Sequence, residues 1–437
     1  MYHFKSFTLN LLTVLFAMAF FAGCKKESAF RYPAKPQVTI AAGDERLNNK
    51  LIHLVKDTVY VIVSNISIDS SKKLLVDAGT LLKINGGFFI DIKAGATIEA
   101  KGNVDDPIVF TENANKGKAG FNQWGGIRIY GNANNNVSNI LSYVRIEFAG
   151  AQDNSTFKKV ALTFTGTGTQ TTINNIEVSY SAGNAFEFNS GNCNAANLLC
   201  YASTGIDFNI INGYRGNLQN LLAYRHPLYA SSLLNLGGMY ISGDSTSPNV
   251  SNLTVLGAGL LYGVNQQYFL GSPYKRAGLI TEGNCKFHLR NSAILGFANA
   301  AYYLDSYNSA ASLDSGKSEF TYSVINHADT SKAFYLPPGT YSTATSINLK
   351  NFYLRPEFHN ELSASTGSFN LVAPFNYYDN IPNPLPNSGN PILTGANFSG
   401  VFSDPFFKKV NYRGALGADN WLQGWVNFIP LQTDYNN

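Results

Sequence analysis

The chain has 437 residues, of which only 14% are charged, whereas Gly contributes 39 residues, Tyr 25 and Phe 30. This composition favours a β-rich fold with a polar, uncharged surface over a helical fold. The formal net charge of +4 includes Lys5 near the N-terminus, so the rest of the chain is close to neutral and an electrostatic search for nucleic acid is excluded.

The N-terminus has the pattern of an export signal. Lys5 precedes a mostly apolar run at residues 9–23, which is too short to span a bilayer comfortably and ends in small residues before Cys24. The sequence FAGC at residues 21–24 resembles the lipobox of bacterial lipoproteins, in which the cysteine is acylated, with Phe21 where that pattern usually has Leu. We therefore predict a lipoprotein signal peptide at residues 1–23 and lipidation of Cys24, which would hold the protein on a membrane. An ordinary cleaved signal with an incidental cysteine is the alternative.

Short strands and Gly or Asn corners recur along the chain. The unit DAGTLLKI at residues 77–84 returns as KAGATIEA at residues 93–100. A second unit, Asn followed by alternating apolar residues, begins at Asn139, Asn175, Asn197, Asn220, Asn252 and Asn291, with steps of 22 and 23 residues from 175 to 197 to 220. Such a period with β-type alternation predicts a β-solenoid of stacked parallel coils. Because Asn and Gly tolerate left-handed corners and stacked Asn side chains can hydrogen-bond as a ladder, we interpret these asparagines as structural.

Several segments resemble a known family. The sequences at residues 60–84, 94–111 and 124–131, which include PIVFT and WGGIRIYG, are similar to the right-handed parallel β-helix (pectin-lyase-like) surface lipoproteins of Bacteroidetes-type bacteria. The segment FFKKVNYRGALGADNWLQGW at residues 406–425 resembles the closing segment of many of the same exported proteins. The resemblance implies an all-β, right-handed parallel β-helix and a lipid-anchored location on the outer membrane, facing outward. Polysaccharide lyases and hydrolases share this fold.

The expected organisation has four parts. After the signal at residues 1–23, the polar and Pro-containing residues 24–38 predict a flexible tether. Residues 39–354 are expected to form the β-helix, with residues 257–286 and 305–318 as loops projecting over one flank. Residues 355–437, where the periodicity fades and Pro is frequent, predict an irregular C-terminal segment and cap. We expect Trp421 and Trp425 to cover the apolar end of the last coil; solvent-facing, sugar-stacking tryptophans are the alternative.

The sequence lacks the usual catalytic and metal-binding motifs. It contains no GxSxG, HExxH, Walker or EF-hand pattern, and its histidines have no metal-ligand spacing. Cys193, Cys200 and Cys285 are odd in number and form no CxxC pair, so we favour buried thiols. A disulfide bridge between Cys193 and Cys200 across a turn is the alternative. We expect no cofactor and no metal site, apart from the Ca²⁺ alternative that follows.

One group of polar residues is a candidate site. Strand alternation places the residue between two inward apolar neighbours on the outer face, which gives an outward column of Arg128, Thr163, Glu187, Asp207, Tyr303 and Tyr335. Coils about 4.8 Å apart would make Glu187 and Asp207 adjacent carboxylates. They could act as a catalytic acid/base pair or hold Ca²⁺, with Arg128 near an anionic sugar and the two tyrosines as a stacking platform. Alternatively, all of them are solvated side chains on an exposed sheet face.

These observations give two functional hypotheses. The first is a lipid-anchored cell-surface protein, not an enzyme, that binds, adheres to or displays itself toward glycans or partner proteins. The second is a polysaccharide lyase or glycoside hydrolase acting in a groove on the β-helix face through Glu187 and Asp207. The sparse charge favours the first, because enzymes acting on acidic sugars usually need several charged groups in one groove.

Overall fold

The computed structural model describes residues 35–120, 124–131, 137–151, 159–226, 229, 234–257, 275–297, 299–337, 348–364, 369–375, 381–417 and 419–435. Residues 36–433 form one compact unit, to which the description below applies. The predicted signal peptide, Cys24 and most of the predicted tether lie outside the described residues.

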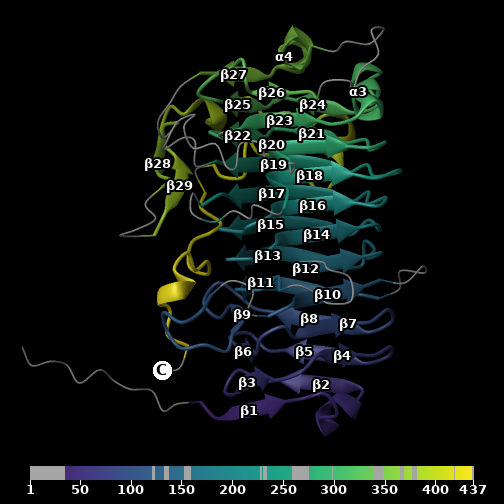
Figure 1. Cartoon of the computed structure of the whole chain (residues 1–437), viewed down its shortest axis with the longest axis vertical. Helices are drawn as coiled ribbons and strands as arrows, with labels where there is room; N and C mark the ends of the chain where they lie inside the picture. The colour runs from purple at the N-terminus through teal and green to yellow at the C-terminus, as the bar shows by residue number, and fades with distance from the viewer. Residues whose placement is uncertain are drawn as a thin grey trace, which may run out of the picture. The chain divides into compact units, whose positions relative to one another are not determined.

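Two parallel sheets run along the length of this unit (Figure 1). Within the described residues, the first sheet contains β1 (Gln37–Ile40), β2 (Leu51–Leu54), β3 (Val59–Ile62), β5 (Lys73–Val76), β6 (Leu81–Ile84), β8 (Thr97–Lys101), β9 (Ile108–Glu112), β11 (Ile140–Glu147), β13 (Thr172–Ser179), β15 (Asn194–Tyr201), β17 (Asn217–Tyr224), β19 (Asn249–Leu256), β21 (His288–Arg290), β22 (Ala293–Leu295), β24 (Glu319–Thr321), β25 (Val324–Asn326) and β27 (Glu361–Ser363). The second sheet contains β4 (Ile66–Ile68), β7 (Phe89–Ile92), β10 (Gly126–Tyr130), β12 (Val160–Thr165), β14 (Asn184–Asn189), β16 (Ile206–Ile211), β18 (Leu236–Ser242), β20 (Arg276–Glu282), β23 (Ala300–Leu304) and β26 (Phe334–Tyr335).

Each turn of chain visits both sheets and pairs in parallel with the next turn, so the predicted all-β parallel β-helix is confirmed. β14, for example, pairs with β12 on one side and with β16 on the other. The remaining described elements are the antiparallel pair β28 (Leu371–Ala373) and β29 (Asn383–Pro386), the helices α3 (Tyr307–Asp314) and α4 (Leu349–Tyr353), and the 3-10 turns η1 (Glu45–Asn48), η3 (Pro356–Phe358), η4 (Pro391–Leu393), η5 (Gly400–Ser403) and η6 (Pro430–Gln432). None of the helices in the described ranges is long and apolar enough to cross a membrane.

A column of left-handed corner residues runs along the first sheet. Asn175, Asn197, Asn220, Asn252 and Asn291 all have φ between 55° and 59°. Asn220 Nδ2 donates to Asn197 Oδ1 at 2.9 Å, and Asn197 Nδ2 donates to Asn175 Oδ1 at 3.3 Å. The predicted corner role is therefore confirmed for these five, because asparagine tolerates the left-handed backbone. The predicted ladder joins Asn175, Asn197 and Asn220, whereas Asn252 and Asn291 donate to backbone carbonyls of the C-terminal segment.

Tyrosine replaces asparagine at both ends of this column. β11 aligns Ser142 with Asn174 and Val144 with Ile176, so Tyr143 (φ 50°) occupies the corner. Asn139 is not a member of the column, because it lies four residues before that corner. Beyond Asn291 the corner is Tyr322 (φ 51°), which is followed in the next coil by His359 (φ 52°).

The interior is filled by stacked apolar side chains. Phe186 and Phe208 stack at 5.3 Å between ring centroids, and Phe164 and Phe188 at 5.4 Å. The three cysteines are buried and unbridged, as the sequence analysis favoured. At the end of the stack beyond β27, the side chains of α4 join the same core through Leu349, Phe352 and Tyr353 (Figure 1).

The C-terminal segment covers the outer face of the first sheet. A second apolar cluster joins sheet residues such as Tyr201, Tyr224 and Leu295 to Leu416 and Phe428 of this segment. Figure 1 shows the chain returning alongside the sheet toward the coils of β9 and β11. Gly414 (φ 79°) permits the close approach, because a Cβ there would lie 2.5 Å from Thr254 Oγ1. We call residues 381–433 the C-terminal strap.

The expected position of the two tryptophans is wrong. Trp425 packs edge-on against Tyr143 of β11 with ring centroids 5.7 Å apart, and Trp421 stacks on Trp425 at 6.4 Å. Both therefore lie on the flank of an early coil, and α4 covers the end of the last one. Trp425 is only 1% exposed, so it does not face solvent as a sugar platform either. The strap packs on the apolar outer face of the first sheet. The alternation of residues in the sequence did not predict that this face is covered.

The two predicted projecting loops differ in outcome. Residues 305–318 contain α3, a two-turn helix whose N-cap Ser306 accepts a hydrogen bond from Ser309 N. Of residues 257–286, the part from Arg276 to Glu282 is strand β20 in the second sheet, and residues 258–274 lie outside the described part of the chain.

Candidate functional site

The predicted outward column exists, with one member replaced. Strand pairing places Arg128 beside Thr163, Thr163 beside Glu187, and Tyr303 beside Tyr335. The neighbour of Glu187 in the next coil is Asn209, and Asn209 is followed by Tyr240, Ile280 and then Tyr303. Glu187 and Asp207 are therefore not adjacent carboxylates, and the prediction of a pair is wrong.

The error is a register shift of two residues. The apolar-x-apolar pattern fits residues 206–208 and also residues 208–210, and strand pairing selects the second by aligning Phe186 with Phe208. Asp207 is fully buried, with Oδ1 accepting from Arg225 Nη1 at 2.5 Å and from Cys200 Sγ at 2.9 Å. Burial raises the pKa of Asp207, opposed by the Arg225 charge. Asp207 thus belongs to a buried ion pair in the interior of the β-helix and is not available to a ligand.

The remaining members of the column have local partners. Arg128 Nε contacts Asp91 Oδ1 at 2.5 Å, and its guanidinium lies 4.1 Å from the centroid of the Phe89 ring. Glu187 accepts a hydrogen bond from Asn209 Nδ2 at 3.0 Å and is only 3% exposed. Tyr303 and Tyr335 are in contact, with ring centroids 4.9 Å apart, and burial raises the pKa of Tyr303 to about 12. The column assembles no acid/base pair and no carboxylate pair for Ca²⁺.

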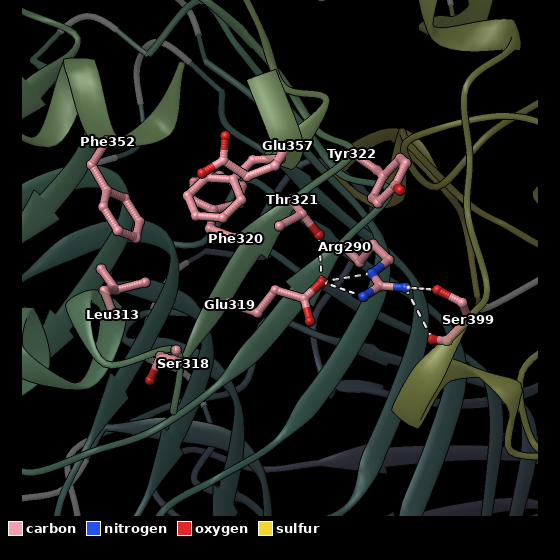
Figure 2. A pocket seen from close by; sticks show the side chains of 12 residues that line it. Arg290, Leu313, Ser318, Glu319, Phe320, Thr321, Tyr322, Phe352, Glu357 and Ser399 are labelled. Atoms are coloured by element: carbon pink, nitrogen blue, oxygen red, sulfur yellow. Dashed lines mark hydrogen bonds and ion pairs between the residues drawn. The ribbon is translucent and has the colours of Figure 1, made fainter. Parts of the chain in front are cut away.

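A pocket of about 310 Å³ lies elsewhere, between β21, β24, α3, η3 and the strap (Figure 2). Its apolar wall consists of Leu313, Phe320, Phe352 and Phe358, and its polar wall contains Arg290, Glu319, Thr321, Tyr322 and Ser399; Glu357, Ser318 and Gly316 complete the lining. A concave site with an apolar wall and a few converging polar groups is the usual form of a small-molecule site. We take this pocket as the candidate functional site.

The local sequence explains why a pocket forms at this point of the β-helix. In the coils before it, Asn fills the left-handed corner and the strap packs closely against the sheet. At Tyr322 the corner carries a large ring, which stacks on His359 at 4.8 Å. The insertion at residues 305–318 then supplies α3 and the turn at Ser318, which form the facing wall. The pocket therefore forms where the Asn column ends and an insertion begins.

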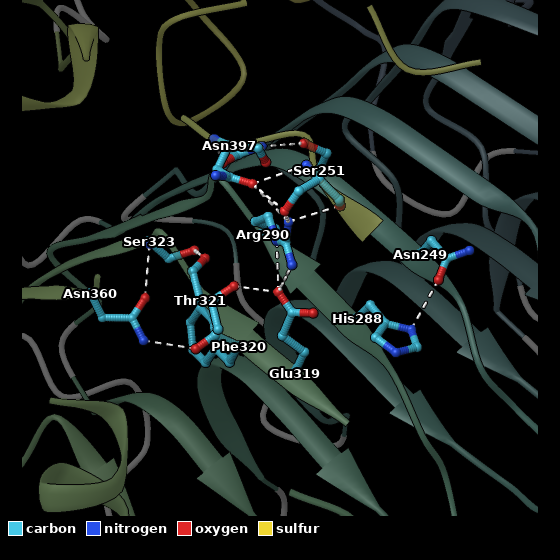
Figure 3. A network of polar contacts seen from close by, with 12 residues as sticks. Asn249, Ser251, His288, Arg290, Glu319, Phe320, Thr321, Ser323, Asn360 and Asn397 are labelled. Atoms are coloured by element: carbon cyan, nitrogen blue, oxygen red, sulfur yellow. Dashed lines mark hydrogen bonds and ion pairs between the residues drawn. The ribbon is translucent and has the colours of Figure 1, made fainter. Parts of the chain in front are cut away.

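The polar wall is fixed by a network centred on Arg290 (Figure 3). Its Nε lies 2.7 Å and its Nη2 2.5 Å from Glu319 Oε1, and its Nη1 donates to Asn397 Oδ1 and to Ser399 of the strap, each at 3.0 Å. Thr321 Oγ1 also donates to Glu319 Oε1. Arg290 thus ties two neighbouring coils to the strap and orders this side of the pocket.

Neighbouring contacts hold the apolar wall. Asn360 Oδ1 accepts from Ser323 N at 2.8 Å, and Asn360 Nδ2 donates to Phe320 O at 2.7 Å (Figure 3). Phe352 and Phe358 pack with centroids 5.0 Å apart, and the Arg355 guanidinium lies 4.5 Å from the Phe352 ring. The aromatic wall is therefore anchored to the last coil before any ligand binds.

None of the residues that line this pocket was predicted from the sequence. One feature could have revealed it: the segment YSVINH at residues 322–327 follows the pattern of NSAILG at residues 291–296, with Tyr322 in the place of the corner Asn. A departure from a structural repeat at a corner indicates a changed local role. No group of three or more His, Cys, Asp or Glu side chains that could hold a metal occurs among the residues with a described position.

Comparison with known proteins identifies the scaffold. The sequence model of a family described as a pectate-lyase-like β-helix domain matches residues 46–139 and 134–351. Together these matches include β2 through β26 and the start of α4, and with them most residues of the pocket. No curated protein matches the chain.

Proposed function

Because the chain belongs to the family of pectate-lyase-like β-helix domains, we propose that it uses this scaffold to bind glycans at the cell surface without cleaving them. The observation that carries this proposal is the pocket beside Tyr322, in which aromatic rings face a carboxylate and hydroxyl groups. Sugars present the same two kinds of surface, since an apolar C–H face alternates with hydroxyls.

The catalytic alternative keeps one supporting observation. Glu319 and Glu357 both line the pocket, and glycosidases use a pair of carboxylates. However, Glu319 Oε1 is held by Arg290 and Thr321, which orients it as a structural group. The original candidates for lyase or hydrolase chemistry, Glu187 and Asp207, lie in different environments.

A glycan array with the purified full-length protein in detergent tests binding, and chromatography of the bound glycans after incubation tests cleavage. The proposal is supported if the wild type retains intact glycans, the Phe358→Ala variant does not, and the Phe88→Ala variant still does. Shortened products that disappear in Glu357→Gln would establish the enzyme instead. Phe88 is a suitable control because it is also a partly buried ring against the main core, at a distant coil.

The proposal includes a lipid anchor. The FAGC sequence at residues 21–24 supports acylation of Cys24, and two or more acyl chains would hold the protein firmly on the outer membrane, with the β-helix facing outward. Metabolic labelling with an alkyne fatty acid should mark the wild-type protein and not Cys24→Ser. Protease treatment of intact cells should then degrade the β-helix if it faces the medium.

A further inference from the structure

The lining of the pocket offers an acidic ligand no cation that is free of a carboxylate partner. Arg290 is the one cationic side chain in the lining, all of which belongs to the described residues. Its Nε and Nη2 contact Glu319, and its Nη1 contacts Asn397 and Ser399. A ligand carboxylate that approached this guanidinium would share it with Glu319 and the strap, so it would meet a cation whose charge a neighbouring carboxylate already offsets.

Acceptors, by contrast, face the pocket. Glu357 is exposed on η3 and lines the opening. The bonds from Arg290 and Thr321 all go to Oε1 of Glu319, and Figure 2 shows the second oxygen of that carboxylate outside this set. Carboxylate oxygens only accept hydrogen bonds when ionised. The polar side of the pocket therefore suits a ligand that donates several hydrogen bonds.

The apolar wall and the volume restrict the ligand further. Phe358 is only partly buried and offers a ring surface for an apolar face, whereas Phe320 and Phe352 are almost completely buried in the wall beside it. A volume of about 310 Å³ is at the lower end of the roughly 300–1,000 Å³ typical of small-molecule sites. One sugar ring fits such a space, whereas an extended run of several rings does not.

From these three features we propose that the pocket selects a single uncharged sugar ring and rejects uronic acids. This inference rests on the proposed glycan-binding function and gives its ligand class. The ring would place its C–H face on Phe358 and donate its hydroxyls to Glu319 and Glu357. A uronate would set its carboxylate against these two acids with no uncommitted cation in the lining to offset the repulsion.

Ligand-observed NMR and calorimetry with methyl glycosides test this inference on the full chain. Methyl glucoside, galactoside and mannoside are compared with methyl glucuronide and galacturonide at pH 7. At least one neutral glycoside should bind at least tenfold more tightly than its uronide. Phe358→Ala should weaken that binding at least fivefold, while Phe88→Ala changes it less than twofold.

Charge is tested separately from packing. Glu357→Gln should narrow the difference between neutral sugar and uronide at least threefold, because one repelling charge is removed, whereas Glu45→Gln on the exposed turn η1 should leave it unchanged. Circular dichroism and unfolding temperature confirm that each variant is folded. A uronide that binds as well as its neutral partner, or sugar binding unaffected by Phe358→Ala, overturns the inference while glycan binding stands. Absence of any glycan on the array overturns the proposed function itself.

Discussion

The guanidinium of Arg290 meets Oε1 of Glu319 through two nitrogens, at 2.7 and 2.5 Å, across the pair of neighbouring strands β21 and β24. The same side chain lies 4.9 Å from the ring of Phe402 in η5 and donates to Ser399. One residue thus joins two coils, the strap and the wall of the pocket. Its planar set of donors suits these several partners, which a lysine could not satisfy together.

Removal of this side chain should loosen the strap. We expect Arg290→Met to lower the free energy of unfolding by about 2–3 kcal/mol, because Glu319 and the strap carbonyl lose a largely buried partner. Urea unfolding measures the change. The control is Arg46→Met, since Arg46 pairs with Asp44 at the surface, where an ion pair contributes about 0–1 kcal/mol. Equal losses in the two variants would contradict a special role for Arg290.

Glu177 should make stability depend on pH. It is fully buried under the strap, where Asn427 N donates to its Oε2 at 2.9 Å, and burial raises the pKa of Glu177 to about 8, with the nearby Glu147 adding to the rise and Arg145 opposing it. A raised folded pKa means that the contribution to stability is fully present below the unfolded value near 4.5 and is lost as pH rises toward 8. The unfolding temperature of the wild type should therefore fall over this window relative to Glu177→Gln.

The difference between wild type and Glu177→Gln measures the effect of Glu177 alone. The buried Asp207 also has a raised pKa, but it contributes equally to the pH dependence of both proteins. Glu45→Gln serves as the exposed control and should follow the wild type. Parallel curves for wild type and Glu177→Gln between pH 4.5 and 8 would show that this carboxyl does not change its charge on folding.

The ion pair between Asp207 and Arg225 should be structural. Asp207→Ala leaves the Arg225 charge buried and should cost about 3–5 kcal/mol. The double variant Asp207→Ala with Arg225→Met should lose less than the sum of the single changes, since neither charge is then unpaired. Chemical unfolding of all four proteins gives the coupling. Additive losses would indicate that the two groups do not interact.

Two substitutions at one corner asparagine should distinguish the contribution of backbone strain to stability from that of hydrogen bonding. Asn197 has φ 56° and bonds to Asn174, Asn175 and Asn220. Asn197→Ala loses these bonds and forces an Ala into the left-handed region, for a loss of about 2–3 kcal/mol. Asn197→Gly loses only the bonds and should be about 1 kcal/mol more stable than the Ala variant. Thermal unfolding distinguishes them, and an Ala variant as stable as the Gly variant would argue against strain.

The repeat in the sequence was sufficient to predict the architecture of stacked coils. Alternating apolar residues and Asn or Gly corners are local requirements of every coil, so the stacking of coils follows from them. The corner role of Asn175, Asn197 and Asn220 could be predicted for this reason. The outward placement of Arg128, Glu187 and Tyr335 followed from strand alternation.

Tertiary structure decided the register, the strap and the pocket. Two overlapping apolar-x-apolar triplets around Phe208 are equivalent in sequence, and only the packing of Phe208 on Phe186 chooses between them, sending Asp207 inward to Arg225. The position of Trp425 on Tyr143 depends on contacts between residues far apart in the chain, for which a local pattern carries no information. The pocket, likewise, arises where Tyr322, α3 and the strap meet, because each supplies one wall and none forms a site alone.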